Sequence, residues 1–381
     1  MDEKFDFVFS GRVRFGCGSR FDLPDLLEQH SYQNVCVVVD QALAELEMVV
    51  ELLDSLRCDH LRKVICDISE PTYAKLDEKR LRKGEKVDVV IGIGGGSALD
   101  MAKAVSVLST NLEDAIVYRG FDMFKNAIPP IIALPTTAGT GSEITPNASF
   151  IDSDSKRKMG INGEAIRPKF AILDPELTLS CPLGPTISAA VDSMVHATEA
   201  FVAKKTNPLA RLCAAEGFST MFSVLPKLIH ELDCADLRKQ AMYGSFVSAI
   251  ALMNSGTGPA AALSYPLGVH FGVPHGLGGA MFLPEVARYN IQNGVHDYVG
   301  LLKKGAFEEP AEELDAHRFL EELEQLWGSL EIPTNLSKYG VISSDVDLIV
   351  KDTLELAGAL EQNPAPFGEK QIRNIIENFV N

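Results

Sequence analysis

Apolar residues follow two different patterns along the chain. Up to about residue 175, short uninterrupted apolar runs at 35–39, 64–68, 87–93 and 131–135 alternate with segments of helical spacing at 72–83 and 98–108. Continuous runs rich in β-branched residues are typical of parallel strands covered on both faces. The alternation therefore predicts βαβ units and a Rossmann-like α/β domain with a parallel sheet over residues 1–180.

The second half of the chain has a different rhythm. Helical spacing recurs, Pro and Gly clusters separate the segments, and strand candidates are almost absent. The expected helices are 186–204, 208–231, 235–253, 276–290, 311–330 and 344–360. This pattern predicts an all-helical domain over residues 181–381.

Composition limits the partners. The chain of 381 residues has a formal net charge of −17, which repels phosphate backbones and anionic lipids, so we expect neither nucleic acid nor a membrane as partner. The N-terminal stretch lacks the pattern of a signal peptide, and no run of about 18 apolar residues is present. The seven cysteines form no C-x-x-C pair, which favours the reducing cytoplasm over a disulfide framework.

A glycine-rich turn follows the third apolar run. Gly94, Gly95 and Gly96 would let backbone N–H groups approach a pyrophosphate. Ser97 is placed to cap the following helix, with Asp100 in capping-box position. Because Ser97 replaces the third glycine of the dinucleotide fingerprint, a tight turn without a ligand stays open as an alternative.

Two further features point to a nucleotide. Between Thr136 and Thr145 the chain has five hydroxyl residues and two glycines, which offer donors to ribose or phosphate. Asp40 ends the first apolar run, where a carboxylate would accept hydrogen bonds from a ribose diol and repel a 2′-phosphate. Helix capping is the alternative role for Asp40.

Asp192 and His196 are spaced i, i+4 on one face of an apolar helix. They form either an internal hydrogen-bonded pair or two ligands of one cation, and a mixed N/O set suits zinc or iron. His275, just before Gly276 at a predicted helix start, could supply a third ligand. His270 stands five residues earlier, in what we predict to be the same Gly/Pro-broken turn.

Several of these residues, including Asp192, His196 and His275, lie in segments that occur in the order seen in the iron-containing (group III) alcohol dehydrogenases, which the chain resembles over roughly residues 5–300. The segments are GGGSALDMAKA, PTTAGTGSE, KRKMGI, DPELT, DSMVHATEAFV and VPHGLGGAMFLPEVARYN. The resemblance implies a Rossmann-like domain followed by a helical domain, with NAD and one divalent metal ion, zinc or iron, as cofactors.

The resemblance also implies roles for individual residues. It places Asp40 at the ribose and NAD-selecting position and residues 94–97 at the pyrophosphate. Asp192, His196 and His275 fall on three of the family's four metal ligands. The remaining residues expected near the cofactor are Thr136, Thr137, Thr140, Ser142, Asn147 and Lys158.

The chain departs from the family at one motif, H-x-x-x-H-P-L-G, where it has Ala261 and Tyr265 in place of the two histidines. Three interpretations stay open. His270 replaces the missing ligand; or the site has three protein ligands, as is normal for catalytic zinc; or metal binding is lost, leaving a metal-free reductase or an NAD-binding relic. Tyr265 and His270 are the candidate catalytic residues, as proton relays.

The implied activity is interconversion of a primary alcohol and an aldehyde. The altered stretch SYPLGVHFGVPHG looks most like the branch that oxidises the C8 hydroxyl of 3-deoxy-D-manno-octulosonate in lipopolysaccharide sugar synthesis, so this sugar acid is the expected substrate. The alternatives are a general alcohol or diol dehydrogenase, an aldehyde reductase, and a cyclase like dehydroquinate synthase, which has a glutamate where this chain has Asp192. We also expect a cytoplasmic homodimer.

Overall fold

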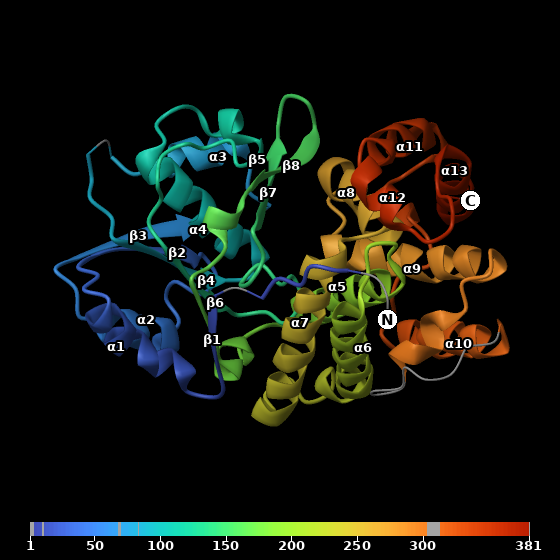
Figure 1. Ribbon diagram of the computed structural model, residues 1–381, viewed down its shortest axis with the longest axis horizontal. Helices are drawn as coiled ribbons and strands as arrows, with labels where there is room; N and C mark the ends of the chain where they lie inside the picture. Colours follow the sequence, from blue (N-terminus) through green and yellow to red (C-terminus); the bar gives the residue numbers. More distant parts are fainter. Residues whose placement is uncertain (1–3, 10, 68–69, 83, 303–312, 381) are drawn as a thin grey trace. The chain divides into compact units, whose positions relative to one another are not determined.

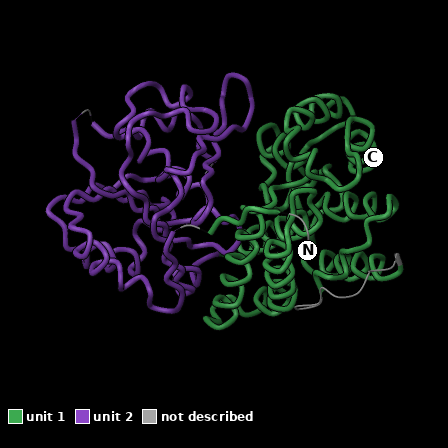
Figure 2. Tube along the Cα trace, in the orientation of Figure 1, with its two compact units in different colours: residues 1–9, 182–381 green, residues 10–181 purple. Residues whose placement is uncertain are grey.

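The computed structural model describes residues 4–9, 11–67, 70–82, 84–302 and 313–380 (Figure 1). The chain divides into two compact units, unit 2 with residues 10–181 and unit 1 with residues 1–9 and 182–381 (Figure 2). The sequence analysis assigned the first nine residues to the α/β domain. Their described part belongs to unit 1 because the backbone of Val8 exchanges two hydrogen bonds with the Asn254 side chain and Phe9 packs edge-on against Phe246.

Unit 2 contains a six-stranded parallel sheet with the strand order β1-β9-β6-β4-β2-β3. The strands are β1 (Arg12–Phe15), β2 (Asn34–Asp40), β3 (His60–Cys66), β4 (Val89–Gly94), β6 (Ile131–Pro135) and β9 (Phe170–Leu173). The predicted Rossmann-like fold is confirmed. The edge strand β1 and its neighbour β9 were not predicted.

Side chains of the central strands alternate between two apolar cores, one on each face of the sheet. In β2, Val35, Val37 and Val39 belong to one core and Cys36 and Val38 to the other. Helices α1 (Leu23–Gln29) and α2 (Glu47–Asp54) cover the first face, and α3 (Tyr73–Glu78) and α4 (Gly96–Thr110) cover the second (Figure 1). Burial on both faces explains why these strands are continuously apolar.

Unit 2 also carries a small second sheet with the order β5-β8-β7. Its strands are β5 (Gly120–Phe121), β7 (Asn147–Asp152) and β8 (Arg157–Asn162). Two predicted elements end earlier than expected. Strand β3 stops at Cys66 and helix α3 stops at Glu78; Ile68 and Lys83, the predicted ends, lie outside the described residues.

Unit 1 is helical, as predicted, and its described residues contain no strand. The helices are α5 (Leu183–Val202), α6 (Pro208–Leu228), α7 (Ala235–Ser255), α8 (Pro259–Phe271), α9 (His275–Gln292), α10 (Glu313–Ser329), α11 (Val346–Leu354), α12 (Ala357–Gln362) and α13 (Glu369–Val380). The expected helix 344–360 is divided between α11 and α12. Residues 311–312 of another expected helix lie outside the described part.

Helix α8 corrects the prediction of a turn around His270. Pro259 stands at the first helical position, where its missing N–H costs nothing. Pro266 lies inside the helix and removes one hydrogen bond, yet the helix continues to Phe271. Gly272, with a φ of 66°, ends it in the left-handed conformation. His270 is therefore in the last turn of a helix, and only residues 272–274 separate that helix from His275.

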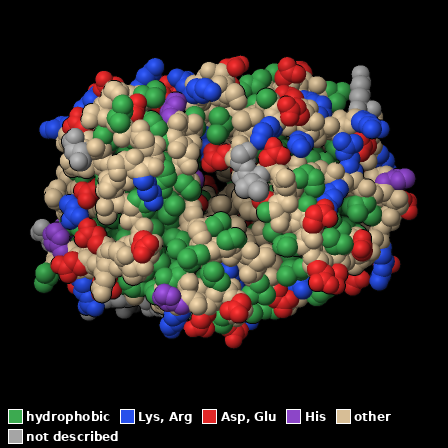
Figure 3. Space-filling view, turned by 180° about the vertical axis from the view of Figure 1, so that it is seen from behind, with side chains coloured by type: hydrophobic (Ala, Val, Ile, Leu, Met, Phe, Trp, Pro, Cys, Tyr) green, Lys and Arg blue, Asp and Glu red, His purple; other side chains and the backbone are tan. Residues whose placement is uncertain are grey.

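No single helix among the described residues is long and apolar enough to cross a membrane. Helices α7 and α8 meet the length and composition criteria only as a pair bent by 103°. On the face drawn in Figure 3, acidic and basic side chains are interspersed.

Candidate metal centre and nucleotide-binding loops

Three predicted metal ligands lie together in unit 1. Asp192 and His196 are on α5, and His275 is the first residue of α9. The Oδ1 atom of Asp192 lies 3.7 Å from Nε2 of His196 and 3.9 Å from Nε2 of His275. The three candidate ligand atoms all lie within 4.8 Å of one another. The i, i+4 spacing places Asp192 and His196 on one face of α5, and the N-terminus of α9 brings His275 to the same place.

Gly276 allows α9 to approach α5 closely. A Cβ atom at this position would lie 2.0 Å from the carbonyl oxygen of Ser188 and 2.8 Å from Cβ of Asp192. Both separations are shorter than van der Waals contact allows, so any side chain at Gly276 would push the two helices apart. The glycine after His275 therefore fixes the distance between that imidazole and Asp192.

The donor set fits a divalent metal ion. One carboxylate oxygen and two imidazole nitrogens suit zinc or iron. A tetrahedral ion with bonds of about 2.1 Å needs ligand atoms about 3.4 Å apart, so small side-chain rotations would close this group around one. In the described part of the chain, Nδ1 of His196 is buried without a hydrogen-bond partner. The 3.7 Å separation from Asp192 is also too long for the internal hydrogen bond considered above.

The glycine turn of unit 2 is built on close backbone packing. Gly94 has a φ of +149°, and a Cβ atom there would lie 2.6 Å from Cβ of Ala98. A Cβ atom on Gly96 would lie 2.8 Å from Cγ2 of Thr140. Gly95, not Ser97, is the N-cap of α4, and no described side chain caps this helix N-terminus. The predicted cap at Ser97 is therefore wrong, because Ser97 lies inside the helix.

Asp100, the predicted partner in a capping box, has another role. Its carboxylate accepts hydrogen bonds from the Ser142 hydroxyl at 2.6 Å and from the Ser149 backbone N–H at 2.8 Å. The buried ammonium of Lys103 donates to the Ser142 hydroxyl at 2.8 Å and to the Asn147 carbonyl oxygen at 2.6 Å. Burial lowers the pKa of Lys103 to about 8. Together these bonds tie the loop between β6 and β7, and the first residues of β7, to helix α4.

The other residues predicted to contact the cofactor differ in their hydrogen bonds and in their exposure to solvent. The Lys158 ammonium bonds to the Glu70 carboxylate at 2.9 Å. Thr136 is buried, whereas Thr137 and Thr140 are partly exposed. Their contacts with a cofactor stay predictions.

Asp40 lies beside the glycine turn. Its Oδ1 atom accepts a hydrogen bond from the Ala42 backbone N–H at 2.9 Å, and burial raises the pKa of its carboxyl group. A Cβ atom on Gly94 would lie 3.0 Å from Cβ of Asp40. The carboxylate closes a turn instead of capping a helix, and it stands next to the glycine predicted to approach the pyrophosphate.

Comparison with known proteins decides the family. The protein-family model "Iron-containing alcohol dehydrogenase" matches residues 10–175. The protein-family model "Fe-containing alcohol dehydrogenase family, C-terminal" matches residues 186–380. The chain belongs to the iron-containing alcohol dehydrogenase family. The resemblance identified from the sequence is confirmed, and with it an oxidoreductase that acts on CH–OH groups.

Relatives of this iron-containing alcohol dehydrogenase match over most of their length. The NAD-dependent methanol dehydrogenase of Bacillus methanolicus is 28% identical, covering 95% of this chain and 96% of the relative. The 1,3-propanediol dehydrogenase of Citrobacter freundii is 28% identical, covering 89% of each. The solved structure of an alcohol dehydrogenase from Oenococcus oeni superposes with a TM-score of 0.90 at 25% identity, covering 99% of this chain and 100% of that one. Both cofactor predictions agree with these names, since the family is named for iron and the Bacillus relative for NAD.

The departures of this alcohol dehydrogenase from its family's histidine motif lie on α8. Ala261 is buried, and the ring of Tyr265 stands perpendicular to His275 with 4.9 Å between the ring centroids. His270 is outside the three-residue group, and its Nε2 atom lies 2.8 Å from Oδ2 of Asp352 on α11. Within the described ranges, Asp192, His196 and His275 are the one group of three or more candidate ligands.

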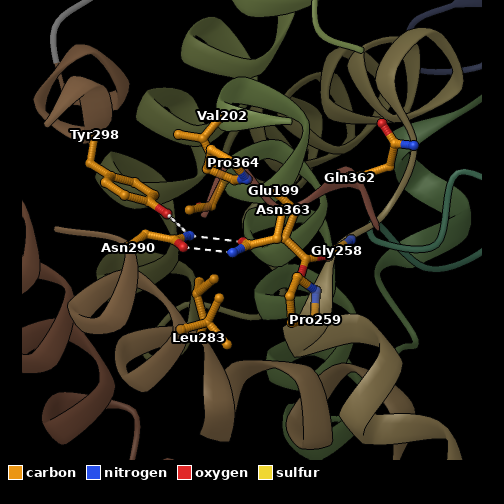
Figure 4. A pocket seen from close by; sticks show the side chains of 12 residues that line it. Glu199, Val202, Gly258, Pro259, Leu283, Asn290, Tyr298, Gln362, Asn363 and Pro364 are labelled. Atoms are coloured by element: carbon orange, nitrogen blue, oxygen red, sulfur yellow. Dashed lines mark hydrogen bonds between the residues drawn. The ribbon is translucent and has the colours of Figure 1, made fainter. Parts of the chain in front are cut away.

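Glu199 is a buried residue of α5 that the sequence analysis did not single out. Its carboxylate accepts hydrogen bonds from the backbone N–H groups of Gly258, Ala260 and Ala261, at 2.7, 2.7 and 3.2 Å. Burial raises the pKa of Glu199 to about 7. The residue lines a pocket together with the hydrogen-bonded Asn290 and Tyr298 (Figure 4). The sequence did contain a signal for Glu199, because it is a charged residue one turn beyond His196 on an apolar helix.

Proposed function

We propose that this protein is a cation-dependent, NAD-linked dehydrogenase that interconverts small primary alcohols or diols with the corresponding aldehydes. The observation that carries the proposal is the group formed by Asp192, His196 and His275. Its oxygen and two nitrogens are a donor set for a divalent transition metal, in a chain whose family is named for iron.

Asp192, His196 and His275 would hold the cation. When bound, the cation supplies Lewis acidity that lowers the pKa of an alcohol hydroxyl. The Asp192 carboxylate offsets one unit of the cation's charge, while two neutral imidazoles offset none, so the site keeps a net positive charge toward an anionic oxygen. A set of three protein ligands also leaves coordination positions for substrate.

Tyr265 is the proposed proton-transfer residue. Its ring lies against His275, and a phenol can exchange a proton with a reacting hydroxyl. His270 contacts Asp352, so we propose that its role is structural and that it links α8 to α11.

Unit 2 would hold NAD, which supplies the hydride acceptor. Backbone N–H groups at the uncapped start of α4 suit the pyrophosphate, because helix N-termini favour anions. Asp40 would bind the adenosine ribose and disfavour a 2′-phosphate. Thr137 and Thr140, which are partly exposed next to Gly95 and Gly96, would offer hydroxyl donors.

The choice of small alcohols and diols rests on the relatives, which are named for methanol and 1,3-propanediol. Neither is named for a sugar acid, so 3-deoxy-octulosonate becomes one member of a substrate panel. A homodimer also stays a prediction, which light scattering of the purified protein would test.

The test combines a substrate panel with metal removal. Purified protein is assayed for NAD reduction with methanol, 1-propanol, 1,3-propanediol and 3-deoxy-octulosonate, before and after dialysis against a chelator. We expect turnover of the small alcohols, its loss on chelation, and its recovery with Fe²⁺ or Zn²⁺. Full activity of metal-free protein would contradict the proposed mechanism, and turnover of the sugar acid alone would contradict the substrate class.

Three variants sharpen the test. His275→Ala should lose the cation and its activity together. His270→Ala is the matched control on the preceding helix and should keep the cation, because its imidazole is bound to Asp352. Tyr265→Phe should keep the cation and lose about 100-fold or more in turnover, as for a missing acid–base group.

A further inference from the structure

Ser264 of α8 contacts both a backbone carbonyl and a candidate metal ligand. Its Oγ atom lies 2.6 Å from the carbonyl oxygen of Ala261, in the same helix, and 2.6 Å from Nδ1 of His275. Ser264 itself is buried, with 1% of its surface exposed. The imidazole is also flanked by the perpendicular ring of Tyr265.

A close approach of α8 and α9 makes this contact possible. A Cβ atom on Gly278, three residues after His275, would lie 2.9 Å from Cβ of Ser264. The absence of a side chain at Gly278 therefore allows the hydroxyl to reach the ring.

The two short contacts fix the direction of the hydrogen bonds. A serine hydroxyl has one hydrogen to donate, and a carbonyl oxygen can only accept. Once the Ser264 hydroxyl donates to Ala261, it can meet Nδ1 of His275 only as an acceptor, so Nδ1 must carry the hydrogen. The Nε2 atom, which faces Oδ1 of Asp192 at 3.9 Å, then keeps its lone pair.

We infer that Ser264 is a positioning residue that holds His275 in the Nδ1–H tautomer and aims its Nε2 lone pair at the cation. The inference rests on the proposed cation site. Hydrogen bonds of this kind orient metal-ligating histidines and raise their basicity, and removing them typically costs 10–100-fold in metal affinity.

His196 provides the contrast. Its Nδ1 atom is buried without a hydrogen-bond partner in the described part of the chain. No serine or carbonyl among the described residues sets its tautomer, so the effect of Ser264 should be confined to His275.

The first test is spectroscopic and uses the unmodified protein. In metal-free protein at about pH 8.5, where an ordinary imidazole is neutral, nitrogen-15 chemical shifts distinguish Nδ1–H from Nε2–H. The His275 signals are assigned by their loss in His275→Gln. We expect Nδ1–H for His275 in the wild type and a mixture of tautomers in Ser264→Ala. An Nε2–H tautomer in the wild type would overturn the inference.

The second test measures affinity for Zn²⁺ by competition with a chromophoric chelator, without NAD or substrate. Ser264→Ala should bind the ion about 10–100-fold more weakly than the wild type. Ser248→Ala is the matched control, because Ser248 is equally buried and its hydroxyl donates to the Gly244 carbonyl of its own helix at 2.9 Å. It should keep wild-type affinity.

The outcomes separate the two proposals. If His275→Ala binds Zn²⁺ as tightly as the wild type, the proposed cation site is wrong. If His275→Ala binds weakly while Ser264→Ala binds like the wild type, the site stands and the role of Ser264 is wrong.

Discussion

The loop between β6 and β7 in unit 2 and the metal group in unit 1 use their polar side chains in opposite ways. The Ser142 hydroxyl in the loop and the carbonyl of Asn147, the first residue of β7, are already bonded to the buried Lys103 ammonium. In the metal group, Oδ1 of Asp192 lies 3.7 Å from Nε2 of His196 and 3.9 Å from Nε2 of His275, and both separations are too long for a hydrogen bond. Polar groups of the loop are therefore hydrogen-bonded to helix α4, whereas the Asp192 carboxylate makes no hydrogen bond to either imidazole of the metal group.

This difference follows from what each ligand needs. A pyrophosphate can be bound by backbone N–H groups at a helix start, so the side chains around it are available to fix the backbone. A transition metal ion needs lone pairs from side chains, which internal hydrogen bonds would occupy. A polar side chain near the glycine turn therefore need not contact the nucleotide. A polar side chain near Asp192 is a stronger indication of direct contact with a metal ion.

Lys103→Met tests the structural part of this comparison and should have the largest effect. It removes the buried ammonium that lies 3.8 Å from the partly buried Asp100 carboxylate and that donates to Ser142 and Asn147, so we expect the free energy of unfolding to fall by about 3–5 kcal/mol. Urea unfolding measures the change. Lys86→Met is the control, because Lys86 is exposed and pairs with Asp88 at 3.4 Å, a contact worth at most about 1 kcal/mol. Equal effects of the two variants would end the claim that Lys103 holds the loop.

Glu143→Gln sharpens the comparison through pH. Burial raises the pKa of Glu143 to about 6 in the folded state, against 4.5 for the free side chain. Between these values the folded protein holds a proton that the unfolded chain lacks, so this group favours folding as pH falls through 6. Above pH 6 the buried charge opposes folding by about 2 kcal/mol, at 1.36 kcal/mol per pKa unit.

Since glutamine is neutral throughout, Glu143→Gln should raise the free energy of unfolding by about 2 kcal/mol at pH 8 and hardly at all near pH 4.5. Thermal unfolding at both pH values measures the difference. Glu51→Gln on the exposed side of α2 should show neither effect. A gain that is the same at both pH values would contradict the assigned pKa shift.

Asp40 should give the smallest effect. Asp40→Asn keeps an oxygen that can accept the hydrogen bond from Ala42 but removes the charge. We expect the preference for NAD over NADP to fall about tenfold, which is about 1.4 kcal/mol. Asp40→Gly, which also loses the turn, should relax the preference at least as far. The measurement is kcat/KM with NAD and with NADP for each variant. An unchanged preference in Asp40→Asn would show that another residue selects NAD over NADP.

The sequence predicted the elements whose patterns are local. The buried strands β2, β4 and β6 were found because both faces of the sheet are covered, and α5 was found from its apolar spacing. Helix α8 was missed because Pro266 and the nearby glycines suggest a break, while tertiary packing maintains the helix. Strands β1 and β9 are only four residues long and gave no distinct pattern.

The site shows the same limit. Asp192 and His196 share a helix, so their proximity was visible in the sequence. The contact between Ser264 and His275 depends on the approach of two helices, and that of Lys103 with Ser142 on a loop returning to α4. The spacing of residues along the sequence does not predict contacts between elements that are far apart in the chain.

The attachment of α8 to Glu199 has a consequence for substitution. Glu199 holds the helix through backbone N–H groups of Gly258, Ala260 and Ala261, which every amino acid except proline carries. The identity of the side chain at position 261 can therefore change while these hydrogen bonds persist. A chain attached in this way can exchange a candidate ligand for alanine and keep the same attachment of α8 to α5.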